Sequence, residues 1–537
     1  MFSKALPIWE GFFFISESCK IKAMKKLPIG IQTIDKIITN GYVYVDKTEH
    51  ALKLIRGGAY YFLARPRRFG KSLFLNTLKE IFLGNKELFK DCAIYSSDYS
   101  WEKHPVIYFD FTKIPSHTPE QLEASLKRTL KKASKLYNKN VDIPSVEEGL
   151  DNLVEELTKD NKVIVLIDEY DKPLIDRLSS PEIAKANREI LKSFFGTLKG
   201  LDEHLKFVFV TGVSKFSQVS LFSGFNNLED ITVDPISSTI MGYTEEEIRK
   251  SFADHLDHLA KGSSQESLIN EMRRWYNGYR FSREGAPVYN PHSTLKFLKT
   301  GHTQSYWYST VTPSFLIEQI KERPLSSLDL SQSEAKETEL LNINDIQKID
   351  LQALMWQTGY LTLRNYDPQT SLYELDFPNQ EVREAFFDSL LSDFAEIKPS
   401  KVITAAAECK QELENIDLDA FFERINHYFA SVPYTLFENA REGFYHAVFL
   451  SLLEGMGIKT YSEQKTNIGR IDLVVEMPLI IYIFEFKKDQ SADAALEQIK
   501  NTKYGEKYTQ SGKKLIHVGV NFSSKSRNIS EWKALGF

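Results

Sequence analysis

The stretch "AYYFLARPRRFGKSLFLNTLKEIFLG" (59–84) decides the fold of the first half of the chain. Its beginning, 59–65, is an aromatic and apolar run that predicts a buried strand. Residues 71–84 carry apolar side chains at helical spacing up to a glycine. Between them, "GKS" (70–72) ends the pattern G-x-x-x-x-G-K-[ST] of a phosphate-binding loop, although Arg65 stands where that pattern has its first glycine.

The residues of this loop have the chemistry that a nucleotide phosphate requires. The backbone at Gly70 and the start of the following helix offer N–H groups, Lys71 adds a positive charge, and the Ser72 hydroxyl suits a magnesium ion. Arg67 and Arg68 either face the phosphates or lie in solvent. As an isolated tripeptide, G-K-S is much more often an ordinary helix start than a phosphate-binding loop, so a second motif is needed.

An acidic strand about a hundred residues later supplies that second motif. "VIVLIDEYDKP" (163–173) places Asp168 and Glu169 at the end of a continuous apolar run. In P-loop NTPases such a strand presents one carboxylate to Mg²⁺ and a second to the attacking water. Thr211, at the end of the apolar run 206–213, is a candidate sensor of the γ-phosphate, or simply the last residue before a turn. These segments together predict an ATP-binding site on a parallel α/β sheet.

The whole-chain composition excludes several classes of protein. A chain of 537 residues is too long for one hydrophobic core. Its 42% hydrophobic content indicates packed domains, and its net charge of -6 gives no global sign of nucleic-acid binding. Three scattered cysteines and no apolar run of membrane-spanning length indicate a cytoplasmic protein without membrane partners.

The chain divides into an extension and three domains. We interpret 1–23 as an N-terminal extension, either disordered or untranslated if Met24 is the real start. An ATPase-like P-loop domain is expected over 24–240, a mostly helical middle domain over 241–400 and a second α/β unit over 401–537. The predicted fold class is therefore multidomain α/β.

The last unit contains an acidic pair with a lysine. Asp472 begins one predicted strand, and Glu485 and Lys487 lie two residues apart on the next. Period-two geometry sends Glu485 and Lys487 to one face, together with the apolar Ile481 and Ile483. Charges at the end of an apolar row favour a site, although a solvated sheet edge has the same pattern. Two carboxylates with a lysine suit a Mg²⁺- or Mn²⁺-dependent phosphodiesterase.

These motifs resemble one known family. The segments are "LPIGIQTIDKIITNGYVYVDKTEHALKLI" (27–55), "FLARPRRFGKSLFLNTLKEIF" (62–82), "LIDEYDKPL" (166–174), "TGVSKFSQVSLFSGFNNLEDIT" (211–232), "WYNGYRF" (275–281) and "VYNPHSTLKFL" (288–298). Together they are similar to the AAA-ATPase-like family of bacterial proteins with a C-terminal PD-(D/E)XK nuclease domain. The resemblance covers about residues 25 to 530 and makes Arg65 a family trait.

The resemblance also implies roles for particular residues. Glu442, Asp472, Glu485 and Lys487 fall on the nuclease motif positions, with Gln498 and Tyr504 on a supporting helix. Asp472 and Glu485 would ligate Mg²⁺, Lys487 would help to activate water, and Glu442 would add a further carboxylate. Four lysines, Lys488, Lys500, Lys503 and Lys507, either contact a phosphate backbone or form a solvated helix face. In "WYNGYRF" we interpret the aromatic residues as structural and Arg280 as a possible sensor arginine.

The sequence therefore favours an enzyme in which ATP binding and hydrolysis are coupled to a nuclease acting on DNA or RNA. The alternative is a switch protein that binds nucleotide with little hydrolysis and uses the last domain to hold nucleic acid. Homo-oligomerisation fits either hypothesis. Efficient ATP turnover despite Arg65, the kind of nucleic acid and the mode of cleavage all stay open at this point.

Overall fold

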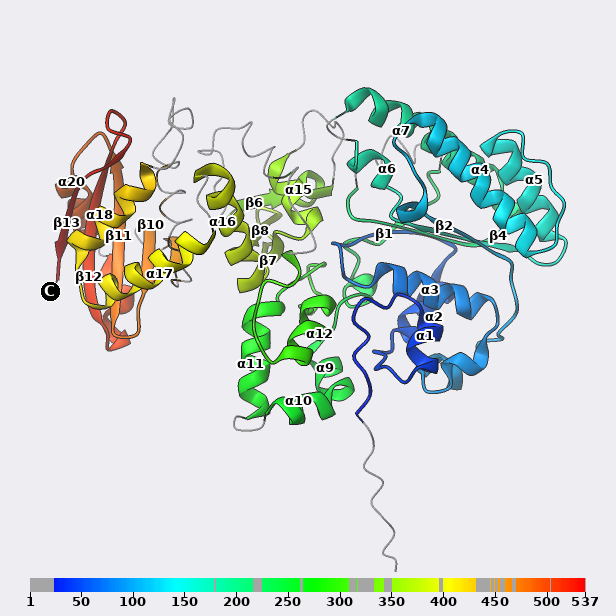
Figure 1. Cartoon of the computed structure of the whole chain (residues 1–537), viewed down its shortest axis with the longest axis horizontal. Helices are drawn as coiled ribbons and strands as arrows, with labels where there is room; N and C mark the ends of the chain where they lie inside the picture. Colours follow the sequence, from blue (N-terminus) through cyan, green and yellow to red (C-terminus); the bar gives the residue numbers. More distant parts are fainter. Residues whose placement is uncertain are drawn as a thin grey trace, which may run out of the picture.

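The computed structural model describes most of the chain, in three parts that follow one another along its long axis (Figure 1). A parallel sheet with helices on both faces comes first, helices around a small sheet follow, and a mixed sheet ends the chain. The described residues are 24–177, 180–215, 225–260, 264–308, 316, 333–341, 350–395, 399–430, 445, 449, 453, 458, 460–465, 470–502 and 504–536.

The first sheet has five parallel strands in the order β2-β3-β4-β1-β5. The strands are β1 (Tyr60–Ala64), β2 (Val106–Asp110), β3 (Val163–Asp168), β4 (Leu205–Gly212) and β5 (Glu229–Asp230). Strand β4 lies between β1 and β3, so the ends of the phosphate-loop strand and of the acidic strand flank it. Because carboxyl ends of parallel strands meet at one edge, this order brings the two predicted motifs together. The predicted α/β fold is confirmed.

Alternate side chains of these strands enter two different cores. Phe207 and Phe209 of β4 pack on the side of helix α3 (Lys71–Phe82), whereas Val208 and Val210 enter the core on the other face. The helices on that second face are α4 (Pro119–Leu136), α5 (Val146–Thr158) and α7 (Pro181–Gly200). Both faces of the sheet are therefore buried, which explains why its strands read as continuous apolar runs.

The middle part is mostly helical, as predicted, but it also holds a sheet that the sequence did not predict. Its main helices are α9 (Glu245–Ser251), α10 (Ala253–Leu259), α11 (Gln265–Tyr276), α12 (Pro291–Thr300), α15 (Leu351–Thr358) and α16 (Gln380–Ala395). The antiparallel sheet consists of β6 (Ser333–Lys336), β7 (Thr362–Asp367) and β8 (Leu372–Asp376). Strands β7 and β8 are only partly buried, so they lack the continuous apolar runs by which strands were recognised.

The last sheet has five strands in the order β13-β12-β11-β10-β9. They are β9 (Thr460–Lys465), β10 (Arg470–Glu476), β11 (Ile480–Lys488), β12 (Lys514–Ser523) and β13 (Asn528–Leu535). Helix α20 (Ala492–Asn501) joins the parallel neighbours β11 and β12 and packs on one face; α18 (Leu418–Phe429) packs through its phenylalanines on the other. Helix α20 ends at Asn501, and a 3₁₀ segment (Tyr504–Ser511) follows.

Candidate functional site

The phosphate-binding loop turns at a left-handed glycine into the start of α3. Gly70 has φ 96° and is the N-cap of α3, with no side chain capping the helix. The first N–H groups of α3 are therefore available to an anion. The buried Lys71 Nζ donates to the carbonyls of Arg65 (2.9 Å) and Pro66 (3.1 Å), and burial lowers the pKa of this lysine. Its charge is thus held against the loop itself.

Asp168 lies within hydrogen-bonding distance of the loop, as the two-motif prediction requires. The Ser72 hydroxyl donates to its Oδ2 at 2.6 Å, and the Thr211 hydroxyl donates to its Oδ1 at 2.8 Å. Tyr108 on β2 makes a longer contact of 3.4 Å to Oδ2. Burial raises the pKa of Asp168, while the Ser72 and Thr211 hydrogen bonds oppose that rise. Thr211 is fully buried and touches Asp168, so its hydroxyl positions this carboxylate.

A second buried carboxylate, Asp171, was not identified from the sequence. Its Oδ2 accepts the backbone N–H of Val213 (3.0 Å) and both the N–H (2.7 Å) and the hydroxyl (2.9 Å) of Ser214. Burial raises its pKa to about 6. Asp171 thereby ties the turn after β3 to the turn after β4. The only signal in the sequence was a third acid, three residues after Asp168.

A cavity of about 310 Å³ opens beside the loop. Glu169 lines this cavity. Its backbone φ is 53°, a left-handed conformation that is uncommon for residues other than glycine and that turns the chain away from the direction of β3. Arg67, half-buried, and Arg68, exposed, also line the cavity. The other lining residues are Pro28, Gly30, Ile31, Gln32, Gly70, Lys71, Ser72, Leu73, Lys172, Tyr243, Pro291, His292 and Leu295. The cavity thus brings together the N-terminal segment, the loop and helix α12.

Arg65, the residue in place of the first loop glycine, points into the protein core. Its guanidinium donates to the carbonyls of Ala64 (2.8 Å), Thr232 (2.7 Å) and Ser237 (2.8 Å), and lies 4.1 Å from the centre of the Phe281 ring. The side chain is 1% exposed, and burial lowers its pKa to about 9. Arg65 therefore fastens the end of β1 to the segment after β5 and is not among the residues that line the nucleotide cavity.

The second predicted site forms where β10 and β11 pair. The antiparallel register that aligns Leu473 with Phe484 continues to Asp472 opposite Glu485. Asp472 Oδ2 accepts the Phe486 N–H at 2.9 Å, and Lys487 Nζ lies 3.3 Å from Glu485 Oε1. Glu485 is 1% exposed. The structure thus brings two carboxylates and a lysine together on adjacent strands.

The neighbouring strand has a glycine beside this acidic pair, where helix α20 packs closely on the sheet. Gly519 on β12 is aligned with Glu485, and a Cβ there would lie 2.3 Å from the Ala492 carbonyl at the start of α20. Glycine is therefore required for α20 to pass so close to the sheet. Gln498 lies on α20 and is half-buried. Glu442 and the side chain of Tyr504 lie outside the described residues.

Both sites have ligands that fit a divalent metal ion. At the first, the Ser72 hydroxyl and the Asp168 carboxylate lie one hydrogen bond apart; at the second, Asp472 and Glu485 occupy adjacent strands. Such oxygen ligands are those that Mg²⁺ and Mn²⁺ prefer. Among the residues that the structure describes, no group of three or more His, Cys, Asp or Glu side chains forms a ready cluster.

The fold and the two sites define the class: a P-loop, AAA-ATPase-like protein joined to a PD-(D/E)XK nuclease-like domain. The family described as "Predicted AAA-ATPase" matches residues 28–222, and the PD-(D/E)XK nuclease superfamily matches 440–532. An uncharacterised protein encoded in the vnfD 5' region of Azotobacter chroococcum mcd 1 is 37% identical over 521 residues, 94% of this chain and 98% of that protein.

The chain belongs to this family of AAA-ATPase-like proteins with a C-terminal PD-(D/E)XK nuclease superfamily domain, as the sequence predicts. Among solved structures, Cdc6p from Pyrobaculum aerophilum has 16% identity and a TM-score of 0.25, covering 66% of this chain and 98% of that one. The Aeropyrum pernix ORC2 protein has 14% identity and a TM-score of 0.22, covering 62% and 87%. Both TM-scores are too low to support a functional comparison.

None of the described helices is both long enough and apolar enough to span a lipid bilayer.

Proposed function

We propose that the protein binds and hydrolyses ATP and that this activity is coupled to a divalent-metal-dependent nuclease that cuts DNA or RNA. The observation that carries the proposal is the grouping of Asp472, Glu485 and Lys487 on adjacent strands. A grouping of this kind at the end of an apolar sheet has no evident structural role that apolar residues would not fill better. The proposal includes the domain boundaries at residues 240 and 400. It also includes a cytoplasmic location of the protein.

At the first site, the chain would bind the nucleotide through its phosphates. The N–H groups at the start of α3 and Lys71 line the cavity and would bind the negatively charged phosphates. Ser72 and Asp168 would hold Mg²⁺, with Thr211 keeping the carboxylate in place. Glu169, whose backbone turns it into the cavity, would orient the attacking water.

At the second site, Asp472 and Glu485 would hold Mg²⁺ or Mn²⁺. The bound metal ion would stabilise charge on the scissile phosphate and lower the pKa of a water molecule. Lys487, which contacts Glu485, would position that water and stabilise the developing negative charge. The Phe486 N–H holds Asp472 in the orientation that this role needs. Glu442, Gln498 and Tyr504 are proposed to support this site.

The test is cleavage of single-stranded DNA, duplex DNA and RNA with Mg²⁺ or Mn²⁺, with and without ATP. Glu485→Gln should reduce cleavage by about 10³-fold, because the loss of a metal ligand removes several kcal/mol of transition-state stabilisation. Glu476→Gln is the matched control, since Glu476 lies on β10 and is paired with Lys513 away from the site.

The outcomes separate the two hypotheses. Cleavage that Glu485→Gln removes and Glu476→Gln retains supports the nuclease, and the lanes with ATP measure its coupling to the first site. A folded wild-type protein that binds ATP and cuts none of the three substrates would contradict the nuclease. That result would favour the nucleotide-controlled binding protein.

A further inference from the structure

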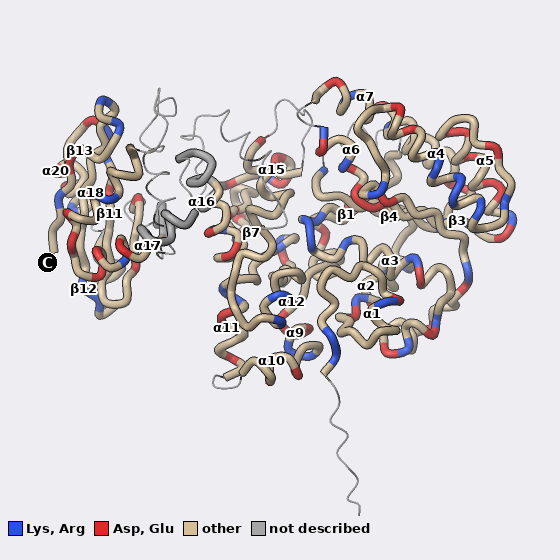
Figure 2. Tube along the Cα trace, in the orientation of Figure 1, with Lys and Arg blue, Asp and Glu red and all other residues tan. Residues whose placement is uncertain are grey.

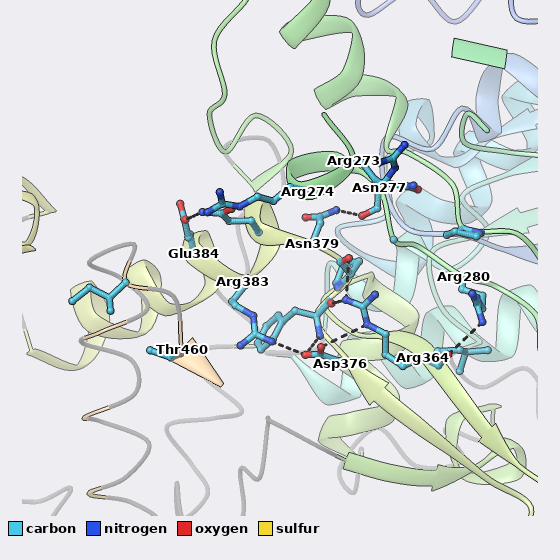
Figure 3. Close-up of a pocket in the computed structure, with 17 residues that line it drawn as sticks. Arg273, Arg274, Asn277, Arg280, Arg364, Asp376, Asn379, Arg383, Glu384 and Thr460 are labelled. Atoms are coloured by element: carbon cyan, nitrogen blue, oxygen red, sulfur yellow. Dashed lines mark hydrogen bonds and ion pairs between the residues drawn. The ribbon is translucent and has the colours of Figure 1, made fainter. Parts of the chain in front are cut away.

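A second cavity, of about 540 Å³, lies between the middle part and the first strand of the last sheet (Figure 3). Five arginines line it, against the two carboxylates Asp376 and Glu384. The arginines are Arg273, Arg274, Arg280, Arg364 and Arg383, from helix α11, the segment after it, strand β7 and helix α16. We call this the arginine cavity. Elsewhere, basic residues gather on the second half of α4 and acidic residues on α5 (Figure 2).

The arginines differ in how they are paired. Arg364 and Arg383 both lie against Asp376, at 3.6 and 2.8 Å, and Arg364 also donates to the Phe377 carbonyl. Arg273 binds Glu245, outside the cavity. In the described part of the chain, however, no carboxylate forms an ion pair with Arg274 or Arg280. Arg274 is exposed and Arg280 half-buried. Arg280 Nη1 donates to the Arg364 carbonyl at 3.3 Å, and Glu384 lies close enough to Arg274 to interact with it electrostatically. Because no ion pair neutralises either charge in the described residues, both guanidinium groups retain donors for an external anion.

Backbone contacts between distant segments fix the shape of the arginine cavity. Gly278 has φ 106°, and a Cβ there would lie 1.9 Å from the Pro378 carbonyl. Asn379 donates to the Asn277 carbonyl at 3.0 Å, and the Arg280 N–H donates to the Thr362 hydroxyl at 2.7 Å. The "WYNGYRF" segment is thus held against the chain after β8. Arg280 belongs to this cavity and does not line the nucleotide cavity, which contradicts its interpretation as a sensor arginine.

The lining suits phosphates better than nucleobases. Its one aromatic residue among those described, Phe377, is 1% exposed and lies under the Arg383 guanidinium, so a base finds no open ring to stack on. Guanidinium groups bind phosphate oxygens in bidentate geometry.

We infer that the arginine cavity binds the phosphodiester backbone of a single nucleic-acid strand. Two of its five arginines, Arg273 and Arg274, are exposed, and its lining also includes Ile458 and Thr460, at the start of β9. Strand β9 pairs with β10, which carries Asp472. A strand held here therefore lies beside the sheet that bears the candidate nuclease residues. This inference rests on the proposed action of the protein on nucleic acid. It assigns the binding of the strand to arginines of the middle domain.

The structure also connects this cavity with the nucleotide loop. Glu381, beside the lining residues Gln380 and Arg383, accepts the Trp307 N–H at 2.6 Å. The indole N–H of Trp307 donates to the Arg67 carbonyl in the loop at 3.0 Å. Two hydrogen bonds and one rigid side chain thus separate the loop from the first turn of α16. A loop that rearranges around nucleotide can therefore shift the arginines.

The experiment measures binding without cleavage. Fluorescence anisotropy of labelled 20-nucleotide single-stranded DNA and RNA is recorded in EDTA, at several salt concentrations, for the full chain and the variant Arg274→Gln/Arg280→Gln. Each phosphate contact contributes about 0.7 to the slope of log affinity against log salt, so the slope should fall by about 1.5. Affinity at low salt should fall about 10-fold or more. The double variant Arg274→Lys/Arg280→Lys keeps the charges and should retain most of the slope.

The matched control is Arg128→Gln/Lys131→Gln, which removes two exposed charges from α4 and should leave the slope unchanged. Equal slopes for wild type and Arg274→Gln/Arg280→Gln would overturn the inference. So would displacement of the strand by equimolar inorganic pyrophosphate or a mononucleotide, which would indicate a site for small anions. Because the assay contains no divalent metal, arginine-dependent binding would stand even if the chain never cleaved nucleic acid. If Arg274→Gln/Arg280→Gln cleaved nucleic acid and bound the strand as tightly as wild type, the proposed nuclease function would stand. The role of the arginine cavity in binding would be rejected.

Discussion

The two sites differ in how the chain brings their charges together. The nucleotide site joins residues about a hundred positions apart, because β4 lies between the loop strand and the acidic strand of a parallel sheet. The nuclease-like site needs only the turn between β10 and β11. In the first, Asp168 accepts two hydroxyl hydrogen bonds; in the second, Glu485 is contacted by a lysine two residues along the same strand.

This difference predicts that the sites respond differently to mutation. The nucleotide site depends on contacts between distant segments, of which the buried Arg65 makes several. The nuclease-like site is positioned by the strand pairing, so its charges can be removed with less effect on folding.

Arg65→Gly restores the glycine of the standard loop pattern, yet it should destabilise the protein by about 3–5 kcal/mol. The substitution leaves a large cavity and removes the partners of the Thr232 and Ser237 carbonyls. Chemical or thermal unfolding followed by circular dichroism measures the effect. Arg68→Gly is the control, because Arg68 is exposed with φ 69°, a conformation that glycine adopts readily. Equal stability of the two variants would contradict the structural role of Arg65.

Lys71→Ala should weaken ATP binding by about 100-fold, or ~2.7 kcal/mol, because the charge nearest the loop is lost. The far sheet should stay folded, so cleavage in the absence of ATP should be unchanged. Isothermal titration calorimetry with a non-hydrolysable ATP analogue measures the affinity. Lys79→Ala, on the same helix and paired with Glu80, serves as the control. Unaltered affinity in Lys71→Ala would refute the P-loop assignment.

Glu381 connects helix α16 to the nucleotide loop through Trp307, and it should make the free energy of unfolding depend on pH. Burial raises the pKa of Glu381 from 4.5 to about 8, so the folded protein keeps this carboxyl protonated where the unfolded chain has lost the proton. The contribution of this protonated carboxyl to the free energy of unfolding is complete below about pH 4.5 and is lost as the pH rises towards 8. The expected slope is about 1.4 kcal/mol per pH unit within that window.

Glu381→Gln keeps a neutral side chain and should therefore lose this dependence. The free energies of unfolding of wild type and variant are compared between pH 5.5 and 8.5, so that groups common to both, such as Asp171, cancel. Glu203→Gln, at an exposed side chain, should behave as wild type. Parallel pH profiles for wild type and Glu381→Gln would show that the carboxyl ionises normally in the folded protein.

The fold was predictable wherever strands are buried on both faces. Strands β1, β3, β4, β10 and β11 contain apolar runs, and the sequence analysis predicts each of them. Strands β6 to β8, β9 and β13 were missed. Strands β7 and β8 are only partly buried, and β13 has a single buried residue, Ile529, so none of these three forms an apolar run. Patterns of hydrophobicity identify strands only where burial is continuous.

The candidate sites were predictable in part, for a related reason. The loop, Asp168, Asp472, Glu485 and Lys487 belong to short local motifs, and the structure brings the members of each set together. The burial of Arg65 and the arginine cavity depend on segments far apart in the sequence that touch only after folding. "WYNGYRF" showed an aromatic cluster, but its docking against Pro378 and Asn379 has no local signature. The four lysines proposed as phosphate contacts stay a prediction.

The smallest effect should come from Trp307→Phe, and it tests whether the sites communicate. The change keeps the aromatic packing against Tyr360 but removes the hydrogen bond to the Arg67 carbonyl, at a cost of about 1 kcal/mol in stability. If the loop and the arginine cavity are coupled, ATP should alter strand affinity in wild type by about 5-fold or more. Trp307→Phe should reduce that factor towards one while ATP binding itself persists. Trp275→Phe, on α11, controls for loss of an indole. An identical effect of ATP on strand affinity in Trp307→Phe and wild type would show that this indole does not carry the coupling. The nucleotide site and the arginine cavity would then act independently of each other through this route.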